Sequence, residues 1–220
     1  MIVGETGVGK GVLARWLHEQ SDRSNGPLVN LGCAGRDAEY LENELFGYEK
    51  LSNGVVTRKA GLFETASGGT VFLDDVIELS SNLQAHLVEM LETGLVRRLG
   101  SSRQRPVDVR IVIATNENLA ELSGYVHAPL WQRLLTFEIP ALRNRPEDIS
   151  ALTEDLLQRL CRGTVTPELS KTAKRALRNH PWPGNIRELK NVLERAIIYS
   201  GGRPEILPQD LIFDRLRSNA

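Results

Sequence analysis

The hydrophobic positions of this chain change their period near residue 140. Before that point, short apolar runs alternate with segments whose apolar residues recur every three or four positions. We interpret the runs as strands at 1–3, 28–31, 70–73, 107–115 and 137–139, and the periodic segments as helices over 11–20, 39–46, 82–92 and 130–135. This alternation predicts an α/β fold with a mostly parallel sheet and helices on both faces. Residues 50–60 have no clear period and are interpreted as a loop or insertion.

From Pro146 onward the pattern is helical. One helix is predicted over 149–160, and a second starts at Thr166-Pro167-Glu168, with Thr166 as the N-cap, and runs to Arg178. A long amphipathic helix follows from Ile186 to Ile197. We therefore predict an α/β nucleotide-binding core over 1–143 and a small all-α domain over 144–220.

The chain begins abruptly. Only three apolar residues, Met1 to Val3, precede a glycine-rich segment, whereas a buried strand normally has about five or six residues. Either the strand is very short or the natural protein continues upstream, and we favour the second interpretation.

The glycine-rich segment has the spacing of a phosphate-binding loop. Its candidate ligand-binding residues are Gly4, Glu5, Thr6, Gly7, Val8, Gly9, Lys10 and Gly11. Glycines let backbone N–H groups surround phosphate oxygens, and Lys10 would reach the β- and γ-phosphates of ATP or ADP. Gly11 stands where a Ser or Thr normally holds Mg²⁺, which weakens the argument for the metal. The alternative is a plain glycine-rich turn.

Acidic and amide side chains follow two later strands. Val71-Phe72-Leu73 ends in Asp74 and Asp75, and Asn116 follows the apolar run that ends at Thr115. Asp74 is the candidate Mg²⁺ ligand, and Asp75 stands where a water-activating glutamate is expected. Asn116 could orient the attacking water, although an Asn after a strand is usually only a turn residue.

Composition narrows the class of protein. Hydrophobic residues make up 41% of the 220 residues, enough for a sizeable core, and the formal net charge is −1. This balance argues against autonomous nucleic-acid binding, which usually needs a basic surface. Two cysteines are too few for a disulfide scaffold, and no run approaches ~18 apolar residues. We expect a cytoplasmic protein without a membrane partner.

These motifs together resemble the AAA+ superfamily. Three further segments narrow the match: Glu44–Lys50 (ELFGYEK), Gly69–Asp74 (GTVFLD) and Trp182–Leu189 (WPGNIREL). Over nearly its whole length the chain is similar to the central domain of bacterial sigma-54-dependent transcription activators. The resemblance implies a P-loop NTPase core with a helical lid, hexameric rings, ATP hydrolysis, and a surface loop that remodels sigma-54 RNA polymerase.

The resemblance also assigns roles to single residues. Lys10 would contact phosphate, Asp74 would ligate Mg²⁺ or orient water, and Asn116 would be the first sensor. Arg133 matches the arginine finger that reaches into the neighbouring subunit, and Arg187 matches the second sensor of the lid. A guanidinium suits both positions because it is always charged and binds phosphate through two hydrogen bonds. A surface ion pair is the alternative for either arginine.

The chain departs from the family pattern where hydrolysis and sigma-54 contact are expected. The sigma-contacting loop, G-A-F-T-G-A in the family, lacks its aromatic residue and its threonine here, and it is one residue shorter. The other departures are Gly32 for an asparagine, Asp75 for the catalytic glutamate, His127 for an arginine and Pro129 for an aspartate. Residues that bind nucleotide are kept, whereas those that couple its hydrolysis to work are altered.

Three hypotheses follow. The first, which we favour, is an ATP-binding domain of a transcription regulator that no longer activates sigma-54 polymerase. Nucleotide or another ligand would set its oligomeric state, and it would act with another sigma form or as a repressor. The second is a working sigma-54 activator with a divergent loop, and the third is an interaction module with a vestigial nucleotide site. DNA contact is expected through a domain outside this chain.

Overall fold

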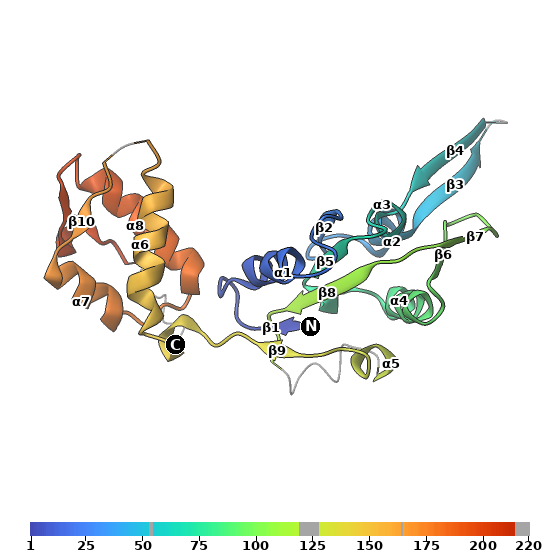
Figure 1. Ribbon diagram of the computed structural model, residues 1–220, viewed down its shortest axis with the longest axis horizontal. Helices are drawn as coiled ribbons and strands as arrows, with labels where there is room; N and C mark the ends of the chain where they lie inside the picture. Colours follow the sequence, from blue (N-terminus) through green and yellow to red (C-terminus); the bar gives the residue numbers. More distant parts are fainter. Residues whose placement is uncertain (53–54, 119–127, 164, 214–220) are drawn as a thin grey trace. The chain divides into compact units, whose positions relative to one another are not determined.

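The computed structural model describes residues 1–52, 55–118, 128–163 and 165–213 (Figure 1). The chain forms two compact units. The first contains Met1–Gly4 and Gly9–Ile139, and the second contains Glu5–Val8 and Pro140–Ala220. Most of the glycine-rich loop therefore groups with the C-terminal part of the chain rather than with the strand that precedes it.

A parallel sheet forms the centre of the first unit. Its five strands are β1 (Ile2–Val3), β2 (Leu28–Gly32), β5 (Thr70–Asp74), β8 (Arg110–Thr115) and β9 (Phe137–Glu138). Their order is β2-β5-β8-β1-β9, and every neighbouring pair is parallel. The predicted parallel sheet is confirmed, although β1 has only two residues.

Helices cover both faces of this sheet, as predicted. Ile2, Phe72 and Val112 pack with residues of α1 (Lys10–Glu19) on one face. The alternate strand residues, such as Val3 and Leu73, pack on the other face with α2 (Ala38–Phe46), α3 (Leu62–Thr65) and α4 (Ser81–Thr93). Successive strand residues point to opposite faces, so strands buried on both sides appear as continuous apolar runs.

Residues 50–60 were predicted as a loop or insertion, and the loop alternative was wrong. β3 (Gly47–Ser52) and β4 (Val55–Ala60) form an antiparallel hairpin in which Gly47 pairs with Ala60 (Figure 1). Most side chains of β4 are exposed. The outer part of this hairpin has both faces in solvent, so its sequence lacks the alternation that reveals a half-buried strand. A second antiparallel hairpin, β6 (Leu95–Arg97) with β7 (Gln104–Pro106), was also not predicted.

Two predicted elements are shorter in the structure. The strand expected over 107–115 begins at Arg110, because the backbone N–H of Val107 donates to Gly94 O and that of Asp108 donates to Ser67 Oγ. The helix expected over 130–135 is α5 (Ala128–Trp131). Beyond it, the N–H of Leu134 bonds only three residues back, to Trp131 O, which is a turn rather than a continuing α-helix.

The second unit is mainly helical. Its helices α6 (Asp148–Leu160), α7 (Lys171–Asn179) and α8 (Asn185–Tyr199) share one apolar core, in which Trp182 is fully buried. The expectation of an all-α unit was incomplete, because β10 (Glu168–Leu169) pairs in parallel with β11 (Glu205–Ile206). Short 3₁₀ turns occur at Leu142–Asn144 and Pro208–Asp210, and another lies at Val76–Glu78 in the first unit.

The predicted start of α7 at Thr166 was wrong. Ser170 is the N-cap, and its Oγ accepts a hydrogen bond of 3.0 Å from the N–H of Ala173. Glu168 and Leu169 are extended because they pair with β11. None of the helices in the described residues is long and apolar enough to cross a membrane.

Candidate functional site

The carboxyl ends of three parallel strands place several predicted site residues at one edge of the sheet. Val3 is in register with Thr115, and Asp74 is in register with Ala114. Gly4, the residue after β1, donates its N–H to Thr115 O at 3.3 Å. Asp74 and Asn116 therefore flank the start of the glycine-rich loop, and ligands of open α/β sheets bind at this edge.

Lys10 begins α1 and is the only buried lysine among the described residues. Lys10 is 9% exposed, and its Nζ donates to Gly4 O at 2.7 Å. This hydrogen bond links the first residue of the glycine-rich loop to the start of α1, both in the first unit. Gly9, the N-cap, has a φ of 108°, and no side chain caps this helix end. The first N–H groups of α1 are therefore available to an anion.

Within the second unit, Asn185 holds the loop segment Glu5–Val8. It is fully buried, and its amide nitrogen donates to Glu5 Oε2 at 3.0 Å and to Thr6 O at 3.1 Å. Its Oδ1 accepts from the N–H of Leu142 at 2.7 Å. The sequence motif contains Asn185, but no role was predicted for it, since its partners are far away in the sequence.

Two arginines add to this hold on the loop, and neither was predicted. Arg143 Nη1 donates to Glu5 Oε2 at 2.9 Å, and Arg145 donates to Val8 O at 3.0 Å. The hydrogen bonds from Arg143 and Asn185 lower the pKa of Glu5 to about 2. Glu5 is therefore ionised at neutral pH, and it links the loop to these two side chains.

Gly7 brings Arg187 close to the loop in the second unit. Gly7 has a φ of 83°, and a Cβ built on it would lie 2.4 Å from Gly184 O and 3.1 Å from Arg187 Cβ. The N–H of Ile186 also donates to Gly7 O at 2.9 Å. Only glycine fits this contact. Arg187 itself is exposed and forms no ion pair within the described part of the chain.

The two acids at the end of β5 differ in backbone conformation. Asp74 is extended and its carbonyl accepts from the N–H of Cys33 at 2.9 Å, whereas Asp75 has a φ of 58° in the left-handed region. Asp and Asn tolerate that region better than most residues. Burial, reinforced by the negative charges of Asp74 and Asp75, raises the pKa of the Cys33 thiol to about 12. The Cys33 thiol, at the start of the segment that follows β2, is therefore uncharged at neutral pH.

Arg133 lies after α5 in the first unit, outside the group of residues at the sheet edge. Its guanidinium forms an ion pair with Glu92 and donates to Pro129 O at 2.8 Å. The structure thus places Arg133 in a surface ion pair, and its role as an arginine finger stays a prediction. His127 lies outside the described residues.

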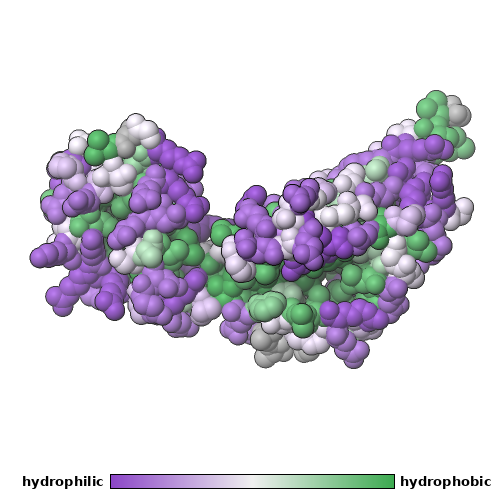
Figure 2. Space-filling model, viewed as in Figure 1, coloured by the Kyte–Doolittle hydropathy of each residue, from purple (hydrophilic) through white to green (hydrophobic). Residues whose placement is uncertain are grey.

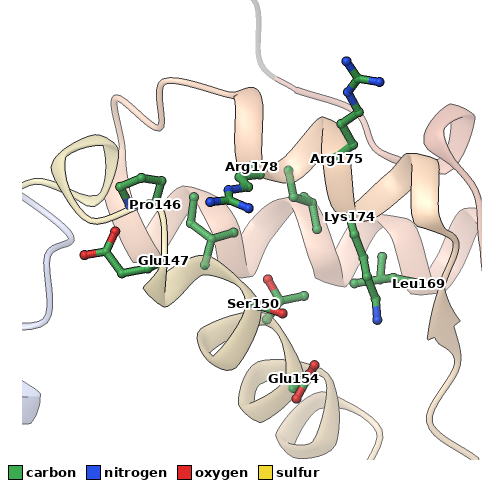
Figure 3. A pocket seen from close by; sticks show the side chains of 11 residues that line it. Pro146, Glu147, Ser150, Glu154, Leu169, Lys174, Arg175 and Arg178 are labelled. Carbon is green, nitrogen blue, oxygen red and sulfur yellow. The ribbon is translucent and has the colours of Figure 1, made fainter.

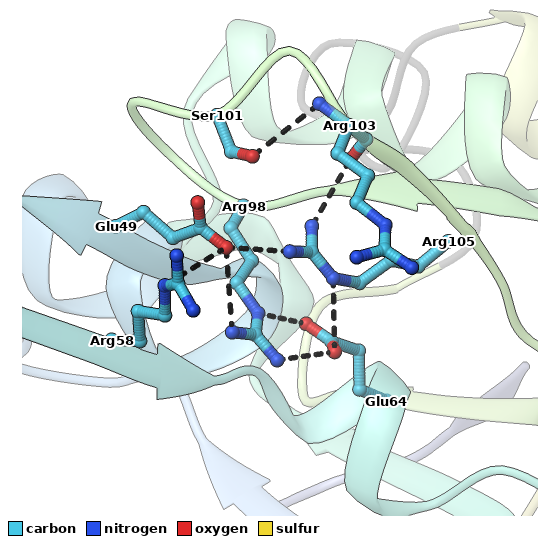
Figure 4. Close-up of polar contacts among 7 residues, drawn as sticks. All are labelled: Glu49, Arg58, Glu64, Arg98, Ser101, Arg103 and Arg105. Atoms are coloured by element: carbon cyan, nitrogen blue, oxygen red, sulfur yellow. Dashed lines mark hydrogen bonds and ion pairs between the residues drawn. The ribbon is translucent and has the colours of Figure 1, made fainter.

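The hairpin β3–β4 has an apolar end and a charged base. Leu51 and Val55, next to the tip, are 74% and 65% exposed, and Figure 2 shows hydrophobic surface there. Asn53 and Gly54 lie outside the described residues. Figure 4 shows the base, where Glu49 contacts Arg105 at 2.5 Å and Arg98 at 3.6 Å.

Glu64 completes this cluster. Arg98 donates to both of its carboxylate oxygens at 2.7 Å, and these bonds hold the pKa of Glu64 below its usual range. Arginines from the neighbourhood of β6 and β7 thereby connect the hairpin base to α3 (Figure 4).

Comparison with known families gives two matches. Residues 1–140 match the family described as the sigma-54 interaction domain, and residues 143–219 match the AAA+ ATPase lid domain. The transcriptional regulatory protein XylR of Pseudomonas putida is 45% identical over 218 residues, which are 96% of this chain and 38% of that protein. The phenol regulator MopR of Acinetobacter guillouiae is 45% identical over 213 residues, 94% of this chain and 38% of that protein. The chain spans about two fifths of the length of these relatives.

Solved structures agree with these matches. NtrX from Brucella abortus in complex with ADP has a TM-score of 0.86 and 33% identity, over 96% of this chain and 48% of that chain. The same protein in complex with ATP has a TM-score of 0.83, with 96% of this chain and 50% of that chain covered. Hsp104, at 12% identity and a TM-score of 0.69, supports the fold alone.

Proposed function

Since this chain belongs to the family of sigma-54 interaction domains, we propose that it binds ATP or ADP as part of a bacterial transcription regulator. We propose further that it hydrolyses ATP slowly and contacts sigma-54 weakly. On this proposal, residues 1–143 form the nucleotide-binding core and residues 144–220 form the lid.

The observation that carries the proposal is the glycine-rich loop between β1 and α1. Gly4 to Gly11 would supply backbone N–H groups to the phosphates, and Lys10 would exchange its bond to Gly4 O for a phosphate oxygen. Gly9, the residue before Lys10, has a φ of 108°, and no side chain caps the start of α1, so its first N–H groups can face an anion. The two NtrX complexes support the choice of adenine nucleotides.

Few protein side chains at this site could bind Mg²⁺. The described residues contain no group of three or more His, Cys, Asp or Glu side chains that could hold a metal. Gly11 offers no hydroxyl, so Asp74 would be the main protein ligand beside the phosphates. When bound, Mg²⁺ would neutralise phosphate charge.

Slow hydrolysis is proposed from the side chains around Asp74. Asp75 is one methylene shorter than glutamate, and a general base must reach the attacking water within hydrogen-bonding distance. A misplacement of about 1 Å can cost about 10²-fold in rate. Gly32 leaves open space where the family has an asparagine, since a Cβ there would meet no atom within 4 Å. Asn116 and Arg187 would sense the bound nucleotide.

Weak sigma-54 contact is proposed from the end of the β3–β4 hairpin. The segment offers Leu51, Val55 and Val56 as exposed residues, without the aromatic residue and the threonine of the family loop. An RNA polymerase sigma factor remains the expected kind of partner. DNA would be contacted by a domain outside this chain, and the cytoplasm is the expected location.

Self-association into a ring is also proposed, with nucleotide setting the oligomeric state. Arg133 would act as the finger in the neighbouring subunit. For this it must leave Glu92, and exposed ion pairs of this kind are weak, worth about 0–1 kcal/mol.

Two other functions are compatible with the family. A working sigma-54-dependent ATPase is favoured by the intact Lys10, Asp74 and Arg187, and a vestigial interaction module by the ion pair that engages Arg133. Nucleotide binding separates the vestigial module from the other two functions. Sigma-54 binding separates the working activator from the weakly contacting domain proposed above.

Replacement of Lys10 with alanine tests nucleotide binding. We expect Lys10→Ala to weaken ATP and ADP binding by about 10- to 100-fold, because a charge-assisted hydrogen bond contributes about 1.5–3 kcal/mol. Titration with a fluorescent ATP analogue measures the effect, with Lys190→Ala, an exposed lysine of α8, as the control. Equal affinity of Lys10→Ala and wild type, or no binding by either, would favour the vestigial module.

A pull-down with purified sigma-54 tests the second part. We expect the wild-type chain to retain no more sigma-54 with ATP and Mg²⁺ than without nucleotide. Clear ATP-dependent retention would contradict the proposal of weak contact and would support a working activator.

A further inference from the structure

A cavity lies within the C-terminal unit, between α6 and α7 (Figure 3). Its volume is about 530 Å³, within the range of about 300–1,000 Å³ that is typical of small-molecule sites. Ile149, Leu169 and Leu177 form its apolar wall. None of its lining residues belongs to the glycine-rich loop or is Arg187, so the proposed nucleotide site does not account for it.

A buried hydroxyl without a partner lies in the wall of this cavity. Thr153 of α6 is 2% exposed, and its Oγ1 has no hydrogen-bond partner among the described residues. Buried polar side-chain atoms nearly always have a partner, because leaving them unpaired is costly. Thr153 is among the residues that line the cavity, so a bound molecule that reaches this buried hydroxyl would provide the missing hydrogen bond.

The positive and negative side chains around the cavity come from different helices. The cations Lys174, Arg175 and Arg178 all come from α7, whereas the acids Glu147 and Glu154 come from the α6 side. None of these five side chains forms an ion pair within the part of the chain that the structure describes. In Figure 3, Arg178 lies over the cavity between the helices, while Arg175 and Glu147 extend away from it.

We propose that this cavity binds a small amphipathic carboxylate. The Thr153 hydroxyl and the Arg178 guanidinium would donate hydrogen bonds to the carboxylate, with Lys174 adding positive charge. The alkyl or aryl part of the ligand would pack against Ile149, Leu169 and Leu177. A monoanion suits the site better than a phosphate, because the wall is mostly apolar and Glu154 would repel a higher negative charge.

Binding of octanoate to the full chain tests this proposal. In ¹H–¹⁵N NMR titrations, we expect saturable shifts of amides in residues 146–154 and 169–178, and at least about fivefold weaker binding of neutral octanol. Arg178→Gln should weaken octanoate binding about tenfold and leave octanol binding unchanged. Lys171→Gln is the matched control, because Lys171 is an exposed cation of the same helix that does not line the cavity.

Two substitutions at Thr153 test the hydroxyl. Thr153→Val keeps the shape and should weaken octanoate binding about fivefold, whereas Thr153→Ser should retain binding within about twofold. The amide spectrum of each variant shows whether the unit is folded. The proposal is overturned if octanoate causes no saturable shifts in these residues, if octanol binds equally well, or if Thr153→Val and Arg178→Gln bind octanoate like wild type.

Discussion

Replacement of Asp75 with glutamate is expected to raise the rate of ATP hydrolysis by about 10²-fold. The added methylene lets the carboxylate of residue 75 reach a water molecule near the γ-phosphate, where Asp75 falls short. Asp75 is half-buried and directly follows Asp74 at the end of β5, so the change lengthens one side chain without altering the core. Steady-state phosphate release at saturating ATP and Mg²⁺ measures the effect.

Controls separate this effect from assembly and stability. Asp75→Asn should stay as slow as wild type, because an amide cannot accept the proton. Since residue 75 has a φ of 58°, glutamate is expected to lower stability slightly, which thermal unfolding reports. If Asp75→Glu remains folded, binds ATP and still hydrolyses it no faster than wild type, the length of this side chain does not limit turnover.

Replacement of Trp182 with alanine is expected to lower the free energy of unfolding of the C-terminal unit by about 3–5 kcal/mol. Trp182 is fully buried, and its ring meets that of His180 edge-on, with 4.7 Å between centroids. Its indole N–H donates to Leu177 O at 2.9 Å, so the substitution removes a hydrogen bond and opens a large cavity.

Urea unfolding followed by far-UV circular dichroism measures this loss. Trp16→Ala is the control, because Trp16 of α1 is 54% exposed, and we expect it to cost less than about 1 kcal/mol. A Trp182→Ala variant as stable as Trp16→Ala would show that the ring does not stabilise the unit as its burial indicates.

The predictable part of the fold is the part where burial leaves a pattern in the sequence. The strands around Val71 and Ile113 are buried on both faces and appear as apolar runs, so the parallel sheet and its flanking helices were predicted correctly. The β3–β4 hairpin was missed because most of its described side chains face solvent. The cap of α7 was misplaced because pairing of β10 with β11 decides where that helix begins.

The same distinction applies to the candidate site. The glycine-rich loop and the acids after β5 form local motifs, and the register of the parallel strands places them at one edge. Asn185 holds Glu5 across 180 residues of sequence, and no local pattern predicts such a contact. The ion pair between Arg133 and Glu92 likewise depends on the packing of α4 near α5 and could not be predicted.

The fate of bound ATP tests the proposed function most directly. ATP labelled at the γ-phosphate is mixed with an excess of the wild-type chain and Mg²⁺, and free, bound and hydrolysed label are followed over time. Typical enzymes turn over about 10 times per second, so a 10²-fold loss predicts bound ATP that stays intact for roughly ten seconds or longer. ATP that remains unbound, or that is hydrolysed within about one second, would contradict the proposal that this domain binds nucleotide and hydrolyses it slowly.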